Sequence, residues 1–374
     1  MTLDAGNDLL NGARFKNGDS IDMGSGDDEV SINVTNSHGT PTYAALNMTK
    51  LDGGAGTDWL IFSNMSSQGS TELTLTGGGA TNFENIIGTL GADIIRGDGS
   101  ANRIHGNRGN DTIHGGSGDD LIAGGSAGGV DDNWHQHNWT SLANDINDAN
   151  SNTILYGDAG DDVLVGTIGN NTLDGGTGAD TIYSGSGSDT IVLRVGDGGS
   201  TLAAADTIAD FTDGSDVFGL SGSMQYTDLT IAQGTGSNSS DTIISIGSEY
   251  LAILTGITAS NVNYFDFAST ATGNQTLSGT SGDDVLIGAA GIDTVTSNTG
   301  NDVIITHGGN DIITIDGSGN KTIDGGSGTD RVNINISGIT SMDSFSSVHR
   351  DTSTGYLSFT SQSGDVISIK NIEQ

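Results

Sequence analysis

The chain has no cysteine, a single proline and only 11 basic residues against 47 acidic ones. Without cysteine there is no disulfide framework, no thiolate metal ligand and no thiol nucleophile. The formal net charge of −36 disfavours nucleic-acid binding, which requires a basic surface. Aromatic residues make up 5% of the chain, and no apolar run reaches the length of a membrane span, so we expect no membrane insertion.

We also expect neither a catalytic motif nor a secretory signal among these residues. None of the seven histidines lies in an H-E-x-x-H zinc-protease motif. The segment GGSAG at 124–128 matches the G-x-S-x-G pattern of esterases, but it lies among glycine-rich repeats without a strand–turn–helix context. The opening MTLDAGNDLLNG has neither the basic nor the apolar region of a secretory signal. We therefore predict that the chain is not an enzyme and assign no catalytic residue.

Glycine is abundant, with 61 residues, and much of it recurs with a nine-residue period. Residues 106–114 read GNRGNDTIH, residues 115–123 read GGSGDDLIA and residues 157–165 read GDAGDDVLV. We number the positions of this nonapeptide from one to nine, so that aspartate stands at position six and a large apolar residue at position eight. A fixed short period indicates a repeat architecture in which neighbouring units stack.

The residue types predict the shape of each repeat. Positions one to six form a turn, because glycine permits positive φ and close approach of neighbouring backbones. Positions seven to nine form a short strand whose position-eight side chain points inward. Two repeats make one turn of a flattened coil, and stacked turns form two parallel sheets around a thin core. The predicted fold class is all-β: parallel β-roll (β-solenoid) blocks with β-sandwich-like capping segments.

The position-six residue supplies metal chemistry. Carboxylate and carbonyl oxygens are hard ligands suited to Ca²⁺, and loops of successive turns face each other along one edge of the coil. One ion between two loops would gather a carboxylate from each. Because the negative charge opposes compaction, we expect folding to be coupled to calcium binding. The candidate metal ligands are Asp8, Asp28, Asp58, Asp93, Asn102, Asp111, Asp120, Asp162, Asn171, Asp180, Asp189, Asp284, Asp293, Asp302, Asp311 and Asp330.

These nonapeptides resemble those of the RTX (repeats-in-toxin) family of secreted calcium-binding proteins. The resemblance implies multiple Ca²⁺ ions, rolls that stay unfolded in the low-calcium cytoplasm, type I secretion and folding outside the cell. Family members include toxins, proteases, lipases, epimerases, surface-layer proteins and adhesins, so the motif identifies a module and leaves the parent activity open.

On this basis we predict a calcium-dependent structural, extender or partner-binding region of a secreted adhesin or surface-associated protein. Its expected partners are calcium ions and a glycan or cell-surface protein. Two alternatives stay open: the non-catalytic C-terminal RTX region of an exported hydrolase or epimerase, and a surface-layer subunit.

The repeat phase divides the chain into five expected segments. They are a short roll with a strand-rich connector (1–87), a main roll with an insertion at 126–151 (88–192), a β-rich cap (193–272), a second roll (273–334) and a strand-rich tail (335–374). A coil needs its open end covered. The aromatic residues expected to do this are Phe211, Phe218, Tyr250, Phe265 and Phe267.

A longer internal repeat is also present. LDGGAGTDWLIF at 51–62 matches IDGGSGTDRVNI at 323–334, and each copy is followed by a strand-rich stretch and an Asn-x-Glu signature, at 82–84 and at 371–373. Because the first signature leads into another roll, we expect the chain to be a segment of a longer repetitive protein. A natural C-terminus, with a secretion signal in 335–374, remains the alternative.

Three departures from the pattern are informative. Lys321 occupies position six in DGSGNKTID at 316–324, so we predict no calcium in that loop and expect the ammonium to substitute for the charge of the ion. Met23 replaces a glycine, which predicts a roll edge where no further turn stacks. The insertion carries Trp134, His135, His137 and Trp139, which either bind a metal, sugar or protein partner or form a loop covering the roll.

Overall fold

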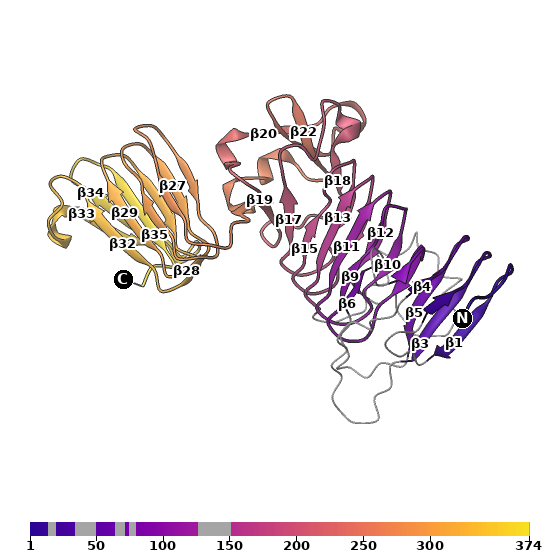
Figure 1. The fold of residues 1–374 in the computed structure, drawn as a ribbon. Coiled ribbons are helices and arrows are strands. Elements are labelled where there is room, and N and C mark those ends of the chain that lie inside the picture. Colours follow the sequence, from indigo (N-terminus) through magenta and orange to yellow (C-terminus); the bar gives the residue numbers. More distant parts are fainter. Residues whose placement is uncertain (14–19, 34–49, 64–71, 75–79, 126–150, 374) are drawn as a thin grey trace, which may run out of the picture. The chain divides into compact units, whose positions relative to one another are not determined.

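The computed structural model describes residues 1–13, 20–33, 50–63, 72–74, 80–125 and 151–373. In these ranges the regular structure is β-strand with a few short 3-10 helices and no α-helix, so the fold is all-β as predicted. The chain forms two compact units, one of Met1–Asp216 with Ile231–Asn261 and one of Val217–Thr230 with Val262–Gln374. Each unit contains a parallel β-roll (Figure 1).

Two long sheets build the roll of the first unit. In spatial order, one sheet contains β1 (Leu9–Ala13), β3 (Glu29–Asn33), β5 (Trp59–Ser63), β8 (Asn85–Ile87), β10 (Arg103–His105), β12 (Leu121–Ala123), β14 (Val163–Val165), β16 (Thr181–Tyr183) and β18 (Asp206–Ile208). The other contains β6 (Glu72–Thr74), β9 (Ile94–Arg96), β11 (Thr112–Ser117), β13 (Ile154–Ala159), β15 (Thr172–Asp174) and β17 (Thr190–Leu193). A small parallel sheet contains β2 (Ser20–Asp22), β4 (Lys50–Asp52) and β7 (Ala80–Thr81).

The strand register confirms that two nonapeptides make one turn. Ile104 pairs with Ile122, and Leu164 pairs with Ile182, 18 residues further along the chain in each case. The position-eight side chains between the sheets, such as those of Ile113 and Leu155, are fully buried. The core is therefore a stack of single aliphatic side chains, and each turn depends on its neighbours for burial.

Antiparallel strands complete the roll of the first unit. β18 pairs in parallel with β22 (Glu249–Leu254), which pairs in antiparallel fashion with β21 (Thr242–Ile246), and β20 (Leu229–Gln233) follows at the sheet edge. The 3-10 helices of this unit are η3 (Leu202–Ala204), η5 (Gly236–Asn238) and η6 (Ala259–Asn261). The segment expected to act as a cap thus extends the roll's own sheet.

The expectation that five aromatic residues cover one open end is not met by Phe265. Phe211 is buried in the first unit, but Phe218, Phe265 and Phe267 belong to the second. Phe265, in the single turn of η7 (Tyr264–Asp266), is 41% exposed. The other two rings pack together inside the second unit, with centroids 5.4 Å apart.

The second unit has the same design with fewer turns. One sheet contains β24 (Thr276–Ser278), β26 (Thr294–Thr296), β29 (Ile312–Asp316) and β32 (Arg331–Asn335). The facing sheet contains β25 (Val285–Ile287), β27 (Asp302–Ile305), β30 (Lys321–Asp324), β35 (Val366–Lys370), β34 (Leu357–Ser361) and β33 (Phe345–Arg350). Smaller elements are the pairs β28 (Gly308–Gly309) with β31 (Ser327–Gly328) and β19 (Val217–Leu220) with β23 (Phe267–Ser269), and the helices η4 (Tyr226–Asp228) and η8 (Met342–Ser344).

The strand-rich tail closes the second roll. β35 pairs in parallel with β30, placing Ile369 beside Ile323, and then continues antiparallel into β34 and β33. Phe359 and Ile367 join the buried row of Val295, Ile304 and Ile313. The tail therefore belongs to the core of this roll.

Met23 does not mark a roll edge, contrary to the sequence prediction. β3 pairs with β1 on one side and β5 on the other, so turns stack on both faces of the loop that contains Met23. Its side chain is fully buried, and its N–H donates to the carbonyl of Asp52 (3.0 Å). A thioether adapts readily to irregular space, which explains its tolerance at a position usually held by glycine.

Candidate metal sites

The position-six side chains form ladders along the edges of both rolls. One carboxylate oxygen, Oδ1, accepts the backbone N–H of position six in the preceding turn. Asp120 N–H donates to Asp162 Oδ1 (2.6 Å), and Asp162 N–H donates to Asp180 Oδ1 (2.8 Å). In the second roll, Asp293 N–H donates to Asp311 Oδ1 (2.7 Å). All the candidate ligands are buried apart from Asp8 and Asp284, which are half-buried.

The second carboxylate oxygen, Oδ2, defines a distinct set of loops. Within the described ranges, no hydrogen-bond donor reaches this buried oxygen in Asp8, Asp28, Asp58, Asp120, Asp162, Asp180, Asp189, Asp311 and Asp330. A buried carboxylate oxygen without a partner carries a large desolvation cost. These nine aspartates therefore require either a proton or a cation.

The acidity of these groups reflects the same burial. Desolvation raises the pKa of Asp58 and Asp180 to about 6, and that of Asp120 and Asp189 to about 7. For Asp162 the pKa rises to about 8, first through burial and then through repulsion from the aspartates of the adjacent turns. In the metal-free state, burial thus favours the protonated form of these carboxyls up to a pH well above the ordinary pKa of aspartate.

Other predicted ligands are already satisfied within their own loops. Thr89 N–H donates to Asp93 Oδ2 (2.6 Å), Thr280 N–H to Asp284 Oδ2 (2.6 Å) and Ala289 N–H to Asp293 Oδ2 (2.8 Å). Asn102 Oδ1 accepts Asp98 N–H (2.9 Å), and Asn171 Oδ1 accepts the hydroxyl of Thr167 (2.9 Å). The candidate ligands are thus not equivalent, although they share one position in the repeat.

The backbone angle at position two separates the two sets. Where its φ is positive, as at Gly116 (φ 113°) and Gly176 (φ 94°), no hydrogen bond from the position-two N–H to the carboxylate of its own repeat is found among the described residues. The same holds for non-glycine residues in this conformation, Asp158 (φ 72°) and His307 (φ 61°). At Thr89, Thr280 and Ala289, where position two has no positive φ, its N–H donates to the aspartate Oδ2. Asp8, in the first turn, is the exception.

The buried ammonium of Lys321 shows where a cation fits between two turns. Its Nζ lies 2.5 Å from the carbonyl oxygen of Gly300, 2.7 Å from Asp302 Oδ2 and 3.2 Å from the carbonyl oxygen of Ser318. By repeat position, these oxygens are the position-four carbonyl and position-six carboxylate of one turn and the position-three carbonyl of the next. All are hard oxygen donors of the kind that calcium takes in proteins.

The same oxygens are present in the loops whose Oδ2 is reached by no donor from the described residues. Gly118 N–H donates to the carbonyl of Ala159 (2.9 Å), and Gly300 N–H donates to the carbonyl of Ser318 (3.0 Å), so the loops stack alike. In the described residues, no three His, Cys, Asp or Glu side chains gather around one point. A metal site here must therefore take several of its oxygens from the backbone, and these loops provide them.

Glycine at position one keeps the space beside the carboxylate open. A Cβ at Gly157 would collide with Asp162 Oδ2 and with the carbonyl oxygen of Gly175 in the next turn. A Cβ at Gly115 would meet Asp120 Oδ2 and the carbonyl oxygen of Gly157 in the same way. The residues present thus fit a calcium ion in both donor type and available space.

Sequence reasoning missed four carboxylates in these ladders. Asp206 Oδ1 accepts Asp180 N–H (3.0 Å) and Asp216 Oδ1 accepts Asp189 N–H (3.1 Å), although no glycine-rich turn precedes either residue. Burial raises the pKa of Asp206 to about 8. The available signal was the triplet Asp-Thr-Ile at 206–208, which repeats the triplet at 180–182.

Glu84 and Glu373 are the other two, and they occupy matching places. Asp58 N–H donates to Glu84 Oε2 (2.8 Å), and Asp330 N–H donates to Glu373 Oε2 (2.8 Å). The long internal repeat noted in the sequence is therefore also a structural repeat. In both copies a glutamate continues the aspartate ladder without a nonapeptide loop.

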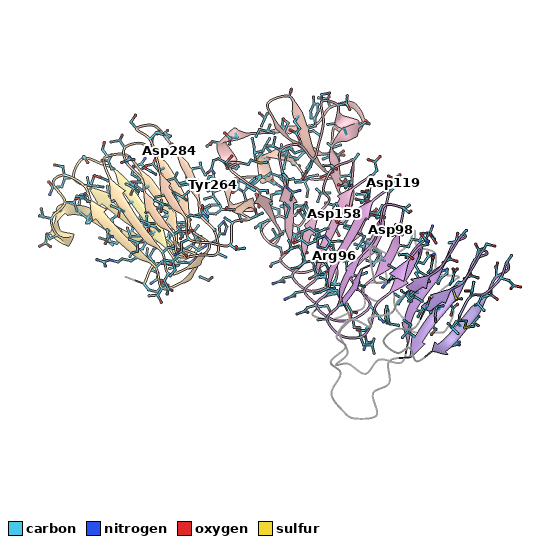
Figure 2. All side chains as sticks on the ribbon, viewed as in Figure 1. Arg96, Asp98, Asp119, Asp158, Tyr264 and Asp284 are labelled. Carbon is cyan, nitrogen blue, oxygen red and sulfur yellow. The ribbon has the colours of Figure 1, made fainter. Side chains whose placement is uncertain are left out.

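Position five forms a second ladder that the sequence analysis did not identify. Asp161 N–H donates to Asp119 Oδ1 (3.1 Å), and Ala179 N–H donates to Asp161 Oδ1 (2.9 Å). Asp119 is exposed, as Figure 2 shows. The position-five carboxylate accepts an N–H from the following turn, whereas the position-six carboxylate accepts one from the preceding turn. Side-chain hydrogen bonds therefore connect each turn to both of its neighbours.

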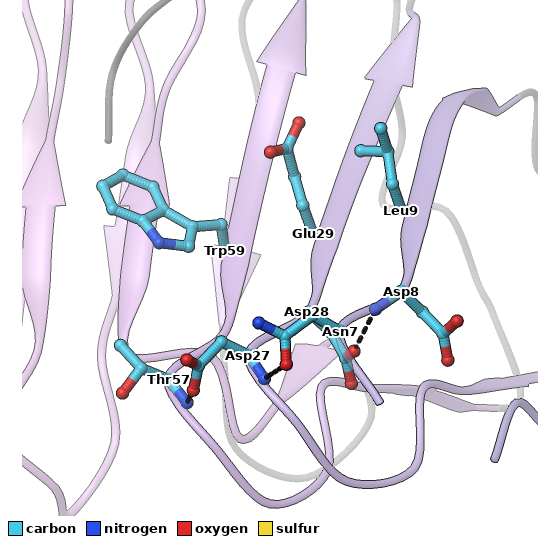
Figure 3. A pocket seen from close by; sticks show the side chains of 8 residues that line it. All are labelled: Asn7, Asp8, Leu9, Asp27, Asp28, Glu29, Thr57 and Trp59. Atoms are coloured by element: carbon cyan, nitrogen blue, oxygen red, sulfur yellow. Dashed lines mark hydrogen bonds between the residues drawn. The ribbon is translucent and has the colours of Figure 1, made fainter. Parts of the chain in front are cut away.

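An open, acidic depression lies beside the first loops of the chain (Figure 3). Leu9, Glu29 and Trp59 stand next to one another at position seven of three successive turns. With Asp27 and Asp28 they line a cavity of about 400 Å³. The predicted partner-binding residues Trp134, His135, His137 and Trp139 lie outside the described residues, so their role stays a prediction.

Comparisons with known proteins identify the repeats. A family model described as the RTX calcium-binding nonapeptide repeat (4 copies) matches residues 78–113, 96–127, 156–191, 269–291 and 287–314. No curated protein matches the sequence. Among solved structures, the chain is similar to the extracellular lipase LipA from Serratia marcescens, with 16% identity and a TM-score of 0.25. That match covers 57% of this chain and 45% of the lipase chain, so the chain spans less than half of that protein. No described helix has the length and hydropathy of a membrane span.

Proposed function

We propose that this chain, a region of RTX calcium-binding repeats, is a non-enzymatic structural segment of a secreted or cell-surface protein. The observation that supports the proposal is the row of buried aspartates whose Oδ1 is bonded to the backbone while Oδ2 lacks a donor in the described residues. An oxygen in this position needs a positive charge beside it. Calcium is the cation whose ligand preferences match carboxylate and carbonyl oxygens.

The proposed ions lie between successive turns along the roll edges. Asp120, Asp162 and Asp180 follow one another on one edge and would hold ions with the carbonyls of positions three and four. Further proposed ligands are Asp8, Asp28, Asp58, Asp189, Asp311 and Asp330. A bound calcium supplies positive charge between turns that otherwise repel one another, while the Oδ1 bonds fix the carboxylates in place.

The remaining position-six residues are proposed to stabilise turns without metal. In the loops of Asp93, Asp284 and Asp293 the position-two N–H already satisfies Oδ2. An N–H group beside that oxygen also opposes the approach of a cation. We therefore propose fewer ions than the number of repeats.

Isothermal titration calorimetry on two matched variants tests this assignment. Asp162→Asn is expected to reduce the number of bound calcium ions by at least one, because it removes a charged oxygen that no donor reaches in the described part of the chain. Asp93→Asn, at an equally buried site, is expected to leave the number unchanged. Loss of an ion in the Asp93 variant but not in the Asp162 variant would refute the assignment. Absence of any calcium binding would refute the proposed function as a whole.

We further propose that the region serves as an extender and is exported unfolded by type I secretion. A chain with a formal charge of −36 resists compaction until cations bind. Force spectroscopy on the full chain, stretched between its ends, is expected to show several resolved unfolding events in calcium and fewer, at lower force, in chelator. Equal unfolding forces in both conditions would contradict this role.

A further inference from the structure

Lys321 is the one position-six residue of the described nonapeptides that carries a positive charge. It begins β30, and its side chain is fully buried next to the fully buried side chain of Asp302. A buried lysine is expensive unless its ammonium is paired and hydrogen-bonded. Here the ammonium has three oxygen partners, from Gly300, Asp302 and Ser318.

The loop also replaces the backbone contact that an aspartate would make. In the regular ladder, the N–H of position six donates to Oδ1 of the next turn, as from Asp120 to Asp162. Lys321 has no such oxygen, and Asp302 N–H donates instead to the carbonyl of Asn320 (2.9 Å). Both functions of the missing carboxylate, the backbone contact and the electrostatic one, are therefore fulfilled without metal.

The two edges of the second roll differ as a result. On the edge of Lys321, the Oδ2 atoms of Asp284 and Asp302 are bonded to Thr280 N–H and to the ammonium. On the opposite edge, Asp311 and Asp330 have an Oδ2 that no donor reaches in the described residues. The carboxylates on the Lys321 edge thus have their hydrogen-bond and charge partners without metal, whereas those of Asp311 and Asp330 require a cation.

We infer that Lys321 is a tethered cation that occupies the place of a calcium ion between the turns of Asp302 and Lys321. The comparison of Lys321 with an ion rests on the proposed calcium sites of the other loops. The stability of the Lys321 edge in the metal-free protein does not depend on those sites. The edge of the second roll that contains Lys321 stays closed when calcium is removed, and it provides a preformed part of the roll on which the calcium-dependent edge assembles.

Hydrogen exchange of the full chain in chelator tests the inference. The amides of 302–305 and 321–324 are expected to be protected in the unmodified chain. Lys321→Met, which keeps the length of the side chain but removes the charge, should speed their exchange by about tenfold or more, since it leaves Asp302 buried without its partner. Lys370→Met is the control, because Lys370 is part-exposed and lies 3.4 Å from Asp324 in the same roll.

A second variant tests whether the ammonium occupies the place of a calcium ion. Lys321→Asp should lose protection in chelator, regain it in calcium and bind one ion more than the unmodified chain by calorimetry. The inference is overturned if these amides are unprotected in the unmodified chain in chelator, if Lys321→Met exchanges like the control, or if Lys321→Asp gains no ion. Because the chelator experiment uses no metal, its result is independent of whether the other loops bind calcium.

Discussion

At the scale of single residues, the backbone at position two determines what the aspartate at position six can bind. Positive φ at Gly176 accompanies an Asp180 Oδ2 that no donor of the described residues reaches, whereas Thr89 N–H donates to Asp93. The nine-residue period reveals position six directly. It did not separate the two kinds of loop, because Asp158 and His307 adopt positive φ without being glycine.

For Lys321, in contrast, the type of side chain was enough to predict how its loop differs from the others. A positive side chain at position six excludes a second cation at the same place, and the sequence alone predicted that the ammonium would substitute for the ion's charge. Its contacts with Asp302 and two carbonyls agree with that expectation. Whether the loop is free of calcium stays a prediction.

A substitution at position one should close a metal site. Gly157→Ala places a methyl group against Asp162 Oδ2 and the carbonyl of Gly175. We expect weaker calcium binding and a free energy of unfolding lower by about 1–3 kcal/mol, the usual cost of overpacking. Urea unfolding in calcium and calorimetry measure the two effects.

Gly99→Ala is the matched control for this prediction. A Cβ at Gly99 would have no heavy atom within 4 Å, and its φ is not positive. This variant should retain the calcium affinity and stability of the unmodified chain. Equal behaviour of the two variants would show that the space beside Asp162 is not needed for the ion.

At the scale of the elements, the strands and their register were predictable because position eight recurs without exception in the best repeats. The parallel pairing of Leu164 with Ile182 follows from a period of two nonapeptides per turn. The antiparallel strands β20–β22 and β33–β35 break that period, so their pairing could not be predicted from it. The places of Asp206 and Glu84 in the ladders were missed for the same reason.

The thin core makes each buried side chain important. Leu164→Ala removes a fully buried side chain between the sheets and should lower the free energy of unfolding by about 2–5 kcal/mol. Ile168→Ala, at a loop side chain that is 39% exposed, should cost much less. Urea unfolding of both variants in saturating calcium measures the difference. Similar costs would indicate that the position-eight stack is not the stabilising core.

At the scale of the whole molecule, the excess of acidic residues links folding to cations of either kind, calcium or protons. Burial raises the pKa of Asp120 to about 7 and that of Asp162 to about 8, against an ordinary value of 3.8. In the metal-free folded state these carboxyls therefore hold protons that the unfolded chain has already released at neutral pH. Protons and calcium compete for the same oxygens.

The pH dependence of the metal-free protein follows from this difference. Since the folded state binds more protons than the unfolded state between about pH 4 and pH 8, its stability must fall as the pH rises through that window. In chelator, circular dichroism should show more β-structure at about pH 5 than at about pH 8.5, where the carboxyls ionise and repel. Calcium affinity should change in the opposite direction and weaken as the pH falls, because protonated carboxyls are poor ligands.

The Asp162→Asn variant provides the internal control for this titration. It removes the carboxyl whose pKa is raised to about 8, so the loss of structure in chelator should become less steep at the alkaline end of the window. Metal-free protein that gains structure as the pH rises from 5 to 8.5 would contradict the proposed state of the buried aspartates. In that case their burial would have to be maintained by something other than proton or calcium binding, and the ladders of Oδ1 bonds would be the first contacts to examine.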